Sequence, residues 1–450
     1  MIQPLTKALR QISDELVTLL APATIRAACT SVGHQWRDRQ LNPVTTIHLF
    51  VLQILHRNTA CAHLPRLTGR TFSASAYCQA RGRLPLAVLQ DLLTRTCHAI
   101  GPMLADAATW RGHRTWLVDG TGVSMPDTPE LQQAFGQPTN QAAGCGFPVA
   151  RVFALFHAGT GFLTRMLIAP LRSHEAAHVA DLHPEMEAGD VLVGDRAFGT
   201  FAHLAGLLAR GLHGVFRLHG KRVVDFTPGR SHPPRWNGPT ATGRSRARWL
   251  RSLGTQDQVV EWFKGYQRPR WLTAEAFSAL PVRLTVRELR YGIERPGFRV
   301  RTVILVTTLL DPVAYPAEAL AQLYGSRWRV ETNLSHLKTT LGMDVLHCQT
   351  EAGVRKELIL FAVVYNLVRA VMVEAGRRQG VPPDQISFVD ALRWLSSAPP
   401  GTPLPDLIVN PARPGRVEPR SQKRRAKKYP YMIRPRAELR KQLLEQPLAA

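Results

Sequence analysis

Acidic residues are scarce in this sequence, and the shortage narrows what the protein can bind. Of its 450 residues only 33 are Asp or Glu, whereas 57 are Lys or Arg, which leaves a formal net charge of +24. A surplus of this size predicts a polyanionic partner. The chain is also longer than one hydrophobic core usually supports, so two to four domains are expected.

Cysteine pairs of the C-x-x-C kind and long uncharged apolar runs are both missing. The six cysteines lack the spacing of a disulfide framework, which indicates a protein of the reducing cytoplasm. The first 20 residues include four charged side chains, so no secretory signal is expected. The most apolar helix candidate, residues 358–373, contains Asn366 and Arg369 and is therefore predicted to be a core helix. We expect a cytoplasmic protein with no membrane partner.

The positive charge is concentrated in two stretches. Residues 217–301 hold 18 basic and 6 acidic side chains, and residues 412–441 hold 12 and 2. Residues 107–216 and 302–411 are slightly acidic instead. An acidic centre that gathers divalent cations, flanked by basic surfaces that hold phosphates, is typical of a metal-dependent DNA enzyme.

Four polar residues near position 330 share one stripe of a predicted helix. Tyr324, Arg327, Glu331 and Lys338 have the spacing Y-x2-R-x3-E-x6-K and fall within an arc of about 60° at roughly 100° per residue. An adjoining apolar stripe contains Leu323, Val330, Leu334, Leu337 and Leu341. A carboxylate beside a phenol, a guanidinium and an ammonium suits metal and phosphate chemistry. The alternative is a solvated face with an ordinary Arg327–Glu331 pair.

Two aspartates upstream follow apolar runs. Asp119 comes after Trp116–Val118, and Asp195 comes after Val191–Gly194, so each carboxylate is predicted at or near the end of a buried strand. Many α/β proteins end strands with Asp. The order Asp, Asp, then Glu331 on a later helix is more specific than either aspartate alone.

This order, together with the Tyr-Arg-Glu-Lys stripe, resembles the DDE transposases of the insertion-sequence-four (IS-four) family. The segments 118–121, 126–130 and 135–136 are similar to the family's first-aspartate block, and 194–199 is similar to the second. Residues 324–338 match the third block at every spacing. Further similarity at 73–81 and 423–430 extends the resemblance over most of the chain.

The resemblance implies an α+β or α/β protein with an interrupted RNase H-like catalytic core. Between residues 107 and 216, the apolar runs predict three strands, a helix, a strand, a helix and a strand, which is the order of such a core. The expected domains are a helical N-terminal DNA-binding domain (1–106), a first core segment with Asp119 and Asp195 (107–216), a basic β-rich insertion (217–301), a second core segment with Glu331 (302–375), and a C-terminal region with a basic tail (376–450).

The resemblance also implies a mechanism and partners. Asp119, Asp195 and Glu331 are expected to hold two Mg²⁺ ions, with Mn²⁺ as a substitute, during end cleavage and strand transfer. Tyr324, Arg327 and Lys338 are expected to bind DNA phosphates. The implied partner is double-stranded DNA, both the transposon ends and the target, and the protein is expected to bind it as a dimer. The protein is expected in a bacterial cell, associated with the nucleoid when it is bound to DNA. A hairpin intermediate is less certain, because residues 301–310 lack the tryptophan of the best-studied hairpin-forming members.

Several further residues are candidate DNA contacts, with ordinary surface or core positions as the alternative. The basic candidates are Arg81, Arg83, Lys423, Arg424, Arg425, Lys427 and Lys428. The aromatic side chains of the insertion that are candidates for stacking on an unpaired base are Trp249, Trp262, Tyr266 and Trp271.

Two other functions compete with this hypothesis. His174-Glu175-Ala176-Ala177-His178 is an H-E-x-x-H sequence, the signature of a zinc metalloprotease, on a predicted helix. The motif is short, and a protease leaves the ordered carboxylates and the localised charge unexplained. The second alternative is a DNA-binding remnant that no longer cuts; the presence of both aspartates and all four stripe residues argues against it.

Overall fold

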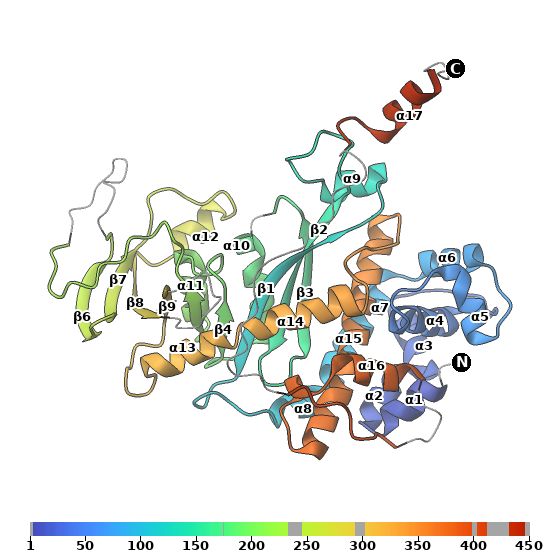
Figure 1. Ribbon diagram of the computed structural model, residues 1–450, viewed down its shortest axis with the longest axis horizontal. Helices are drawn as coiled ribbons and strands as arrows, with labels where there is room; N and C mark the ends of the chain where they lie inside the picture. Colours follow the sequence, from blue (N-terminus) through green and yellow to red (C-terminus); the bar gives the residue numbers. More distant parts are fainter. Residues whose placement is uncertain are drawn as a thin grey trace.

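The computed structural model describes residues 3–173, 175–232, 245–292, 302–397, 403–411 and 432–445. Helices from the N-terminal quarter lie at one end of a long sheet, and strands β6–β8 lie at the other (Figure 1). The sheet therefore connects the N-terminal helices to the basic stretch.

Eight helices form the N-terminal region, in agreement with the helical periodicity of residues 1–106. Apolar periodicity in the sequence predicts one helix over residues 9–20, but a turn at residues 11–13 divides that stretch between two helices. Ser13 directly precedes the second, at a position where serine favours the start of a new helix. The helices are α1 Gln3–Arg10, α2 Asp14–Leu19, α3 Pro22–Ser31, α4 Pro43–Leu55, α5 Leu64–Thr68, α6 Ala74–Arg83, α7 Leu86–Ala99 and α8 Gly101–Ala105.

The predicted succession of three strands, a helix, a strand, a helix and a strand is present. It consists of β1 Thr115–Ser124, β2 Val149–His157, β3 Leu163–Pro170, α10 Glu175–His178, β4 Val191–Gly194, α11 Phe201–Ala209 and β5 His213–Arg217, with α9 Pro129–Phe135 between β1 and β2. The sequence predicts that the first of these helices covers residues 174–182, but a 3₁₀ segment, Val179–Glu185, replaces its second half. β1, β2 and β3 pair antiparallel, whereas β4 is parallel to both β1 and β5.

The basic stretch extends this same sheet. Its strands β6 Arg248–Gly254, β7 Asp257–Phe263 and β8 Arg283–Gly292 pair in an antiparallel series that joins β5 through β9 Thr302–Thr307, and α12 Ala274–Ala279 lies between β7 and β8. The result is one nine-stranded sheet in the order β3-β2-β1-β4-β5-β9-β8-β7-β6. The strand-like runs at 258–263 and 282–289 predict two strands in this stretch, and these correspond to β7 and β8.

The two faces of the sheet have separate cores. Leu117 of β1 and Leu305 of β9 pack with helices α13 Ala317–Gly325, α14 Trp328–Ser335 and α15 Glu351–Gln379. On the opposite face, Val118 and Val306 pack with α11. The described chain ends with α16 Phe388–Ser397 and α17 Arg436–Glu445. Because side chains alternate between the faces of a strand, this division also fixes the face of every polar residue on β1 and β8.

Helix α15 is a core helix, as its sequence predicts. Among the described residues it alone is long and apolar enough to span a membrane, yet its most apolar 18-residue window is 89% buried inside the protein. Two polar residues of α15 hold the start of β3. The Asn366 amide exchanges hydrogen bonds with the backbone of Leu163, the first residue of β3, and Arg369 donates to the carbonyl of Thr160 in the preceding loop.

Glu357 of α15 connects three distant segments. Its fully buried carboxylate accepts hydrogen bonds from the Asn58 side chain at 2.6 Å and from the backbone N–H groups of His347 and Cys348. Glu357→Ala should therefore lower the free energy of unfolding by about 2–4 kcal/mol, because it leaves buried donors without a partner.

Thermal and urea denaturation would measure this loss. Glu351→Ala is a matched control on the same helix, since its half-exposed pair with Arg355 contributes at most about 1 kcal/mol. Equal effects of the two substitutions would contradict the assignment of Glu357 as the connecting residue.

Candidate active site

Asp119 lies on the sheet face that α13, α14 and α15 cover, the face of Leu117. The sequence predicted that the strand ends at or near Asp119. Instead, β1 continues to Ser124 in register with β2. Its parallel neighbour β4, however, pairs only with Thr115–Leu117. Asp119 therefore sits just beyond the end of β4. Its Oδ1 accepts a hydrogen bond from the Gly120 N–H at 2.8 Å.

Asp195 is the first residue after β4, as predicted. Its Oδ1 accepts a hydrogen bond from the Ala197 N–H at 2.8 Å, which closes a tight turn. The turn is anchored by the buried Phe198, whose carbonyl accepts a hydrogen bond from Nδ1 of His203 at 2.7 Å. Asp195 and Asp119 are thus delivered at the ends of the parallel β4–β1 pairing.

The polar stripe is not carried by one continuous helix, contrary to the prediction. Helix α13 ends at Gly325, α14 begins at Trp328, and Lys338 belongs to a π-helical segment, His336–Thr340. Arg327 between the two helices keeps a right-handed helical backbone, with φ −52° and ψ −29°. The turns therefore continue in nearly the same direction, and the four side chains still face one region.

Arg327 joins two of the three predicted carboxylates. Its Nη2 lies 2.7 Å from Glu331 Oε1, and its Nη1 lies 3.4 Å from Asp119 Oδ2. Lys338 Nζ lies 3.1 Å from the hydroxyl of Thr121, which is two residues beyond Asp119 on the same face of β1. The buried Tyr324 completes the group. Residues more than 200 positions apart in sequence thus meet at one place.

The electrostatics show that the three carboxylates are close to one another. Burial raises the pKa of Asp119 to about 6; the Gly120 N–H and Arg327 oppose the rise, and the negative charges of Asp195 and Glu331 add to it. Burial also raises the pKa of Tyr324. The positive charges of Arg327 and Arg217 oppose this rise, and the negative charge of Asp195 adds to it. A carboxyl group made difficult to ionise by burial and like charges is typical of a site completed by a cation.

The donor set fits a divalent metal ion, although Arg327 holds two of its members. Three carboxylates that repel one another are the hard oxygen ligands that Mg²⁺ prefers. Within the described ranges, no three Asp, Glu, His or Cys side chains are already spaced as metal ligands. Release of Asp119 and Glu331 by Arg327 is therefore a condition for metal binding at this site.

Three residues beside this site were not singled out from the sequence. Trp328, next to Arg327, is 51% exposed and lies with its ring centroid 5.9 Å from the Arg327 guanidinium. Arg217 at the end of β5 influences the pKa of Tyr324. Burial raises the pKa of Tyr291 of β8 to about 12, with Tyr324 adding to the rise and Arg217 opposing it. In the sequence, the position of Trp328 beside a basic residue could have marked it as a candidate DNA contact. No feature of the sequence marks Arg217 or Tyr291 in this way.

The other predicted DNA contacts have different outcomes. The prediction for Arg81 is wrong in this structure, because its side chain is 7% exposed and its guanidinium lies 3.8 Å over the ring of Phe50. Arg83 is exposed and stays a prediction. The tail candidates, which are Lys423, Arg424, Arg425, Lys427 and Lys428, lie outside the described residues.

Among the aromatic candidates of the insertion, Trp262 is a core residue. It is 1% exposed, donates a hydrogen bond to Glu288 and is covered by the Arg222 guanidinium at 3.4 Å, so its predicted role in stacking on a base is wrong. Tyr266 is 64% exposed, so a base can reach its ring, whereas Trp249 is half-buried. Trp271 is also half-buried.

The H-E-x-x-H sequence is only partly described. His174 lies outside the described residues, and the Glu175 side chain is outside them too. The ring of His178 stacks on the buried Phe153 at 5.8 Å between centroids. That contact belongs to the sheet face opposite Asp119, so His178 and Asp119 lie on different sides of the sheet.

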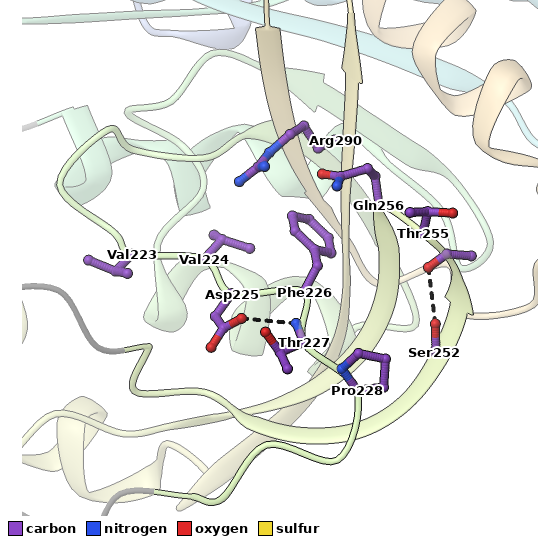
Figure 2. Close-up of a pocket in the computed structure, with 11 residues that line it drawn as sticks. Val223, Val224, Asp225, Phe226, Thr227, Pro228, Ser252, Thr255, Gln256 and Arg290 are labelled. Atoms are coloured by element: carbon purple, nitrogen blue, oxygen red, sulfur yellow. Dashed lines mark hydrogen bonds between the residues drawn. The ribbon is translucent and has the colours of Figure 1, made fainter.

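A hollow of about 690 Å³ lies in the basic stretch. Figure 2 shows Phe226 and Gln256 in its wall, with Arg290 beside them; the Arg290 guanidinium is 4.9 Å from the Phe226 ring centroid. Arg290 alternates with Leu289 and Tyr291, which face the core under α13. The hollow is therefore on the other face of the sheet and is not part of the carboxylate site.

Comparisons with known proteins identify the family of this chain. The model of a family described as "Transposase DDE domain" matches residues 110–367, a range that contains Asp119, Asp195 and Glu331. The transposase InsG for insertion sequence element IS4 of Escherichia coli (strain K12) is 24% identical over 377 residues, covering 79% of this chain and 78% of that protein. The piggyBac transposase, solved in a synaptic complex with hairpin DNA, superposes with a TM-score of 0.43 at 9% identity, over 88% of this chain and 80% of that one.

Proposed function

The chain belongs to the IS-four family of DDE transposases, and on that premise we propose that it binds the terminal inverted repeats of its own insertion sequence and catalyses Mg²⁺-dependent cut-and-paste transposition. The observation that carries the proposal is the meeting of Asp119, Glu331 and Arg327 across more than 200 sequence positions. Membership in the family makes the protein a DNA transposase; the residue roles below are the proposal.

The catalytic core is proposed to be RNase H-like. The strand order β3-β2-β1-β4-β5, with β1–β3 antiparallel and β4 and β5 parallel to β1, supports this assignment. The proposed domain limits are those of the sequence: 1–106 for DNA binding, 107–216 and 302–375 for the core, 217–301 for the insertion and 376–450 for the C-terminal region. Continuity of the sheet through β9 supports an insertion that acts beside the core.

Asp119, Asp195 and Glu331 are the proposed ligands of two Mg²⁺ ions, which Mn²⁺ can replace. When bound, such ions activate a water or a DNA 3′-hydroxyl and stabilise the leaving oxygen. The turn at Ala197 and the N–H of Gly120 orient the two aspartates by holding Oδ1 of each. Oδ2 of Asp119, which lies 3.4 Å from Arg327, becomes available to a metal ion once the guanidinium moves away.

The cationic residues of the stripe are proposed to bind the DNA backbone. Arg327 presents a planar fork that fits a phosphate, and Lys338, held at Thr121, supplies a point charge nearby. Tyr324 lies near both Arg327 and Arg217, so its hydroxyl can donate to the same phosphate. The basic insertion, Arg83 and the tail residues Lys423–Lys428 are proposed to hold the flanking DNA, and the active species is proposed to be a dimer on the nucleoid.

The direct test is cleavage of the DNA termini that flank this protein's own gene. We expect nicked ends that appear only when Mg²⁺ or Mn²⁺ is added, and not with a shuffled terminus. DNA binding without any cleavage under these conditions would favour the inactive remnant instead.

Metal content separates the transposase from a zinc metalloprotease. Cleavage should survive conversion of His174 and His178 to Gln, because imidazole is not a preferred ligand of Mg²⁺. Stoichiometric zinc that these substitutions remove, together with peptide cleavage in the absence of DNA, would overturn the proposal.

Trp328 should contribute to binding DNA ends whose terminal bases are unpaired. Base stacking on an aromatic ring is worth about 1–3 kcal/mol, so Trp328→Ala should weaken binding of a frayed end by roughly 5- to 150-fold. Fluorescence anisotropy with frayed and fully paired ends would measure it. Phe147→Ala, at an exposed aromatic outside both the stripe and the insertion, is the control; the same loss with both kinds of end would assign Trp328 to backbone contact or folding.

A further inference from the structure

Two cysteines, Cys61 and Cys348, lie against the guanidinium of the buried Arg81, and a third, Cys78, lies against Cys61. Cys61, in the short 3₁₀ turn Cys61–His63, and Cys78, on α6, have their sulfur atoms 3.7 Å apart. Arg81 donates to the sulfur of Cys348 at 2.7 Å and lies 3.9 Å from that of Cys61. This cluster lies between the N-terminal helices and the loop before α15, and the proposed cleavage chemistry does not use it.

The three thiols differ in access and environment. Cys78 is exposed, Cys61 is half-buried, and all are free cysteines. Burial raises the pKa of the Cys61 thiol and Arg81 partly offsets the rise. Burial, reinforced by Glu357, raises the pKa of Cys348 further, so that thiol is the least reactive of the three.

Arg81 is fixed in place by groups other than the thiols. Its Nη1 donates to the side-chain carbonyl of Gln53, and Gln53 also accepts from the hydroxyl of Tyr77. The carbonyls of Arg81 and Gly82 accept hydrogen bonds from Lys356 of α15. The sulfur atoms of Cys61 and Cys78 are therefore presented to each other by a rigid frame.

We propose that Cys61 and Cys78 form a peroxide-sensitive thiol pair that closes into a reversible intramolecular disulfide. Hydrogen peroxide oxidises the exposed Cys78 thiol to a sulfenic acid, and one water is released. The sulfur of Cys61 then attacks the Cys78 sulfur; the S–O bond breaks, the leaving hydroxide takes the Cys61 proton as a second water, and the S–S bond forms. Two thiols are oxidised by two electrons and one peroxide is reduced.

The geometry favours this pair over the alternatives. A disulfide needs the sulfurs to approach to about 2.05 Å, and a starting separation of 3.7 Å requires only side-chain rotation at the exposed Cys78. Cys348 is held by Arg81 and is less accessible. A bond of this kind in a reducing compartment is transient and fits a sensor better than a structural crosslink.

Peptide mapping of the full-length protein tests the proposal. After a tenfold excess of hydrogen peroxide, alkylation of remaining thiols and trypsin digestion without reductant, we expect residues 58–66 and 71–81 to be joined, with a mass two hydrogens below the sum of the two peptides. Dithiothreitol should separate them. A Cys78 that ends as sulfinic acid, or that is joined to Cys348 or to a second chain, would overturn the proposal.

Single variants assign the order of the steps. In Cys61→Ser, the Cys78 sulfenic acid should accumulate and be trapped by dimedone; in Cys78→Ser, Cys61 should stay a thiol at the same peroxide dose. Cys145→Ser, a change at a half-buried cysteine elsewhere, is the control and should leave the crosslink unchanged. Dimedone labelling on Cys61 in Cys78→Ser, as fast as on Cys78 in Cys61→Ser, would reverse the assignment of the oxidised residue.

Discussion

Asp119→Asn should abolish Mg²⁺-dependent cleavage of the element's ends while leaving end binding nearly intact. The expected fall in the cleavage rate is roughly three orders of magnitude or more, as for other residues that act as a unit in catalysis. Asp195→Asn and Glu331→Gln should have the same effect, because each removes one carboxylate from a shared set, whereas binding depends on Arg327, Lys338 and the basic surfaces. Single-turnover cleavage and anisotropy measure the two properties separately.

Stability distinguishes loss of chemistry from loss of folding. Because the folded environment raises the pKa of Asp119 to about 6, from an ordinary value of 3.8, its carboxylate is less favourable in the folded protein than in the unfolded chain at pH 7. The folded state gains stability from this group as the pH falls through that raised pKa. Asn, which carries no charge, should therefore unfold at a temperature equal to or above that of wild type at pH 7. Near wild-type cleavage by any of the three variants would remove that residue from the site.

Sequence order was sufficient to predict that these carboxylates lie close together, because the elements around each one leave a recognisable pattern. Asp195 needs a strand before it and a tight turn after it, and both leave a signature at 191–199. The spacing of Arg327 and Glu331 survived an error in the helix itself, since the backbone at Arg327 stays helical where α13 and α14 separate. The residues of a motif can thus face one region as predicted even where the helix that carries them is interrupted.

Burial was the main source of error. Arg81 and Trp262 have the residue types of a DNA-binding surface, but both are satisfied inside the protein, Arg81 by Gln53 and Trp262 by Glu288. These partners lie 28 and 26 positions away, respectively, on elements whose packing no local pattern specifies. Arg217 was missed for the converse reason, because it reaches the site only through the pairing of β5 with β9.

Arg327 should couple DNA binding to metal binding. In the structure its guanidinium neutralises Asp119 and Glu331, so it competes with a metal ion for the same two carboxylates. A DNA phosphate that takes over the guanidinium would release both. DNA should therefore tighten metal binding, and by thermodynamic reciprocity the metal should tighten DNA binding by the same factor, on the order of tenfold.

Arg327→Gln tests the coupling between DNA binding and metal binding. It removes both the positive charge that competes with the metal ion and the group that binds the phosphate. Without DNA, the variant should bind Mn²⁺ on the order of tenfold more tightly than wild type, measured by electron paramagnetic resonance or calorimetry. With DNA, its Mn²⁺ affinity should hardly change further, and its cleavage rate should fall because the phosphate loses its bidentate partner.

The matched control is Arg329→Gln, two residues away. Its guanidinium pairs with Asp384 at 3.1 Å and donates to the Ala158 carbonyl, so its removal should leave Mn²⁺ affinity and its dependence on DNA as in wild type. If Arg327→Gln binds Mn²⁺ no better than wild type in the absence of DNA, the ion pairs of Arg327 do not restrain the carboxylates. The guanidinium would then be a phosphate ligand alone, and it would not couple DNA binding to metal binding.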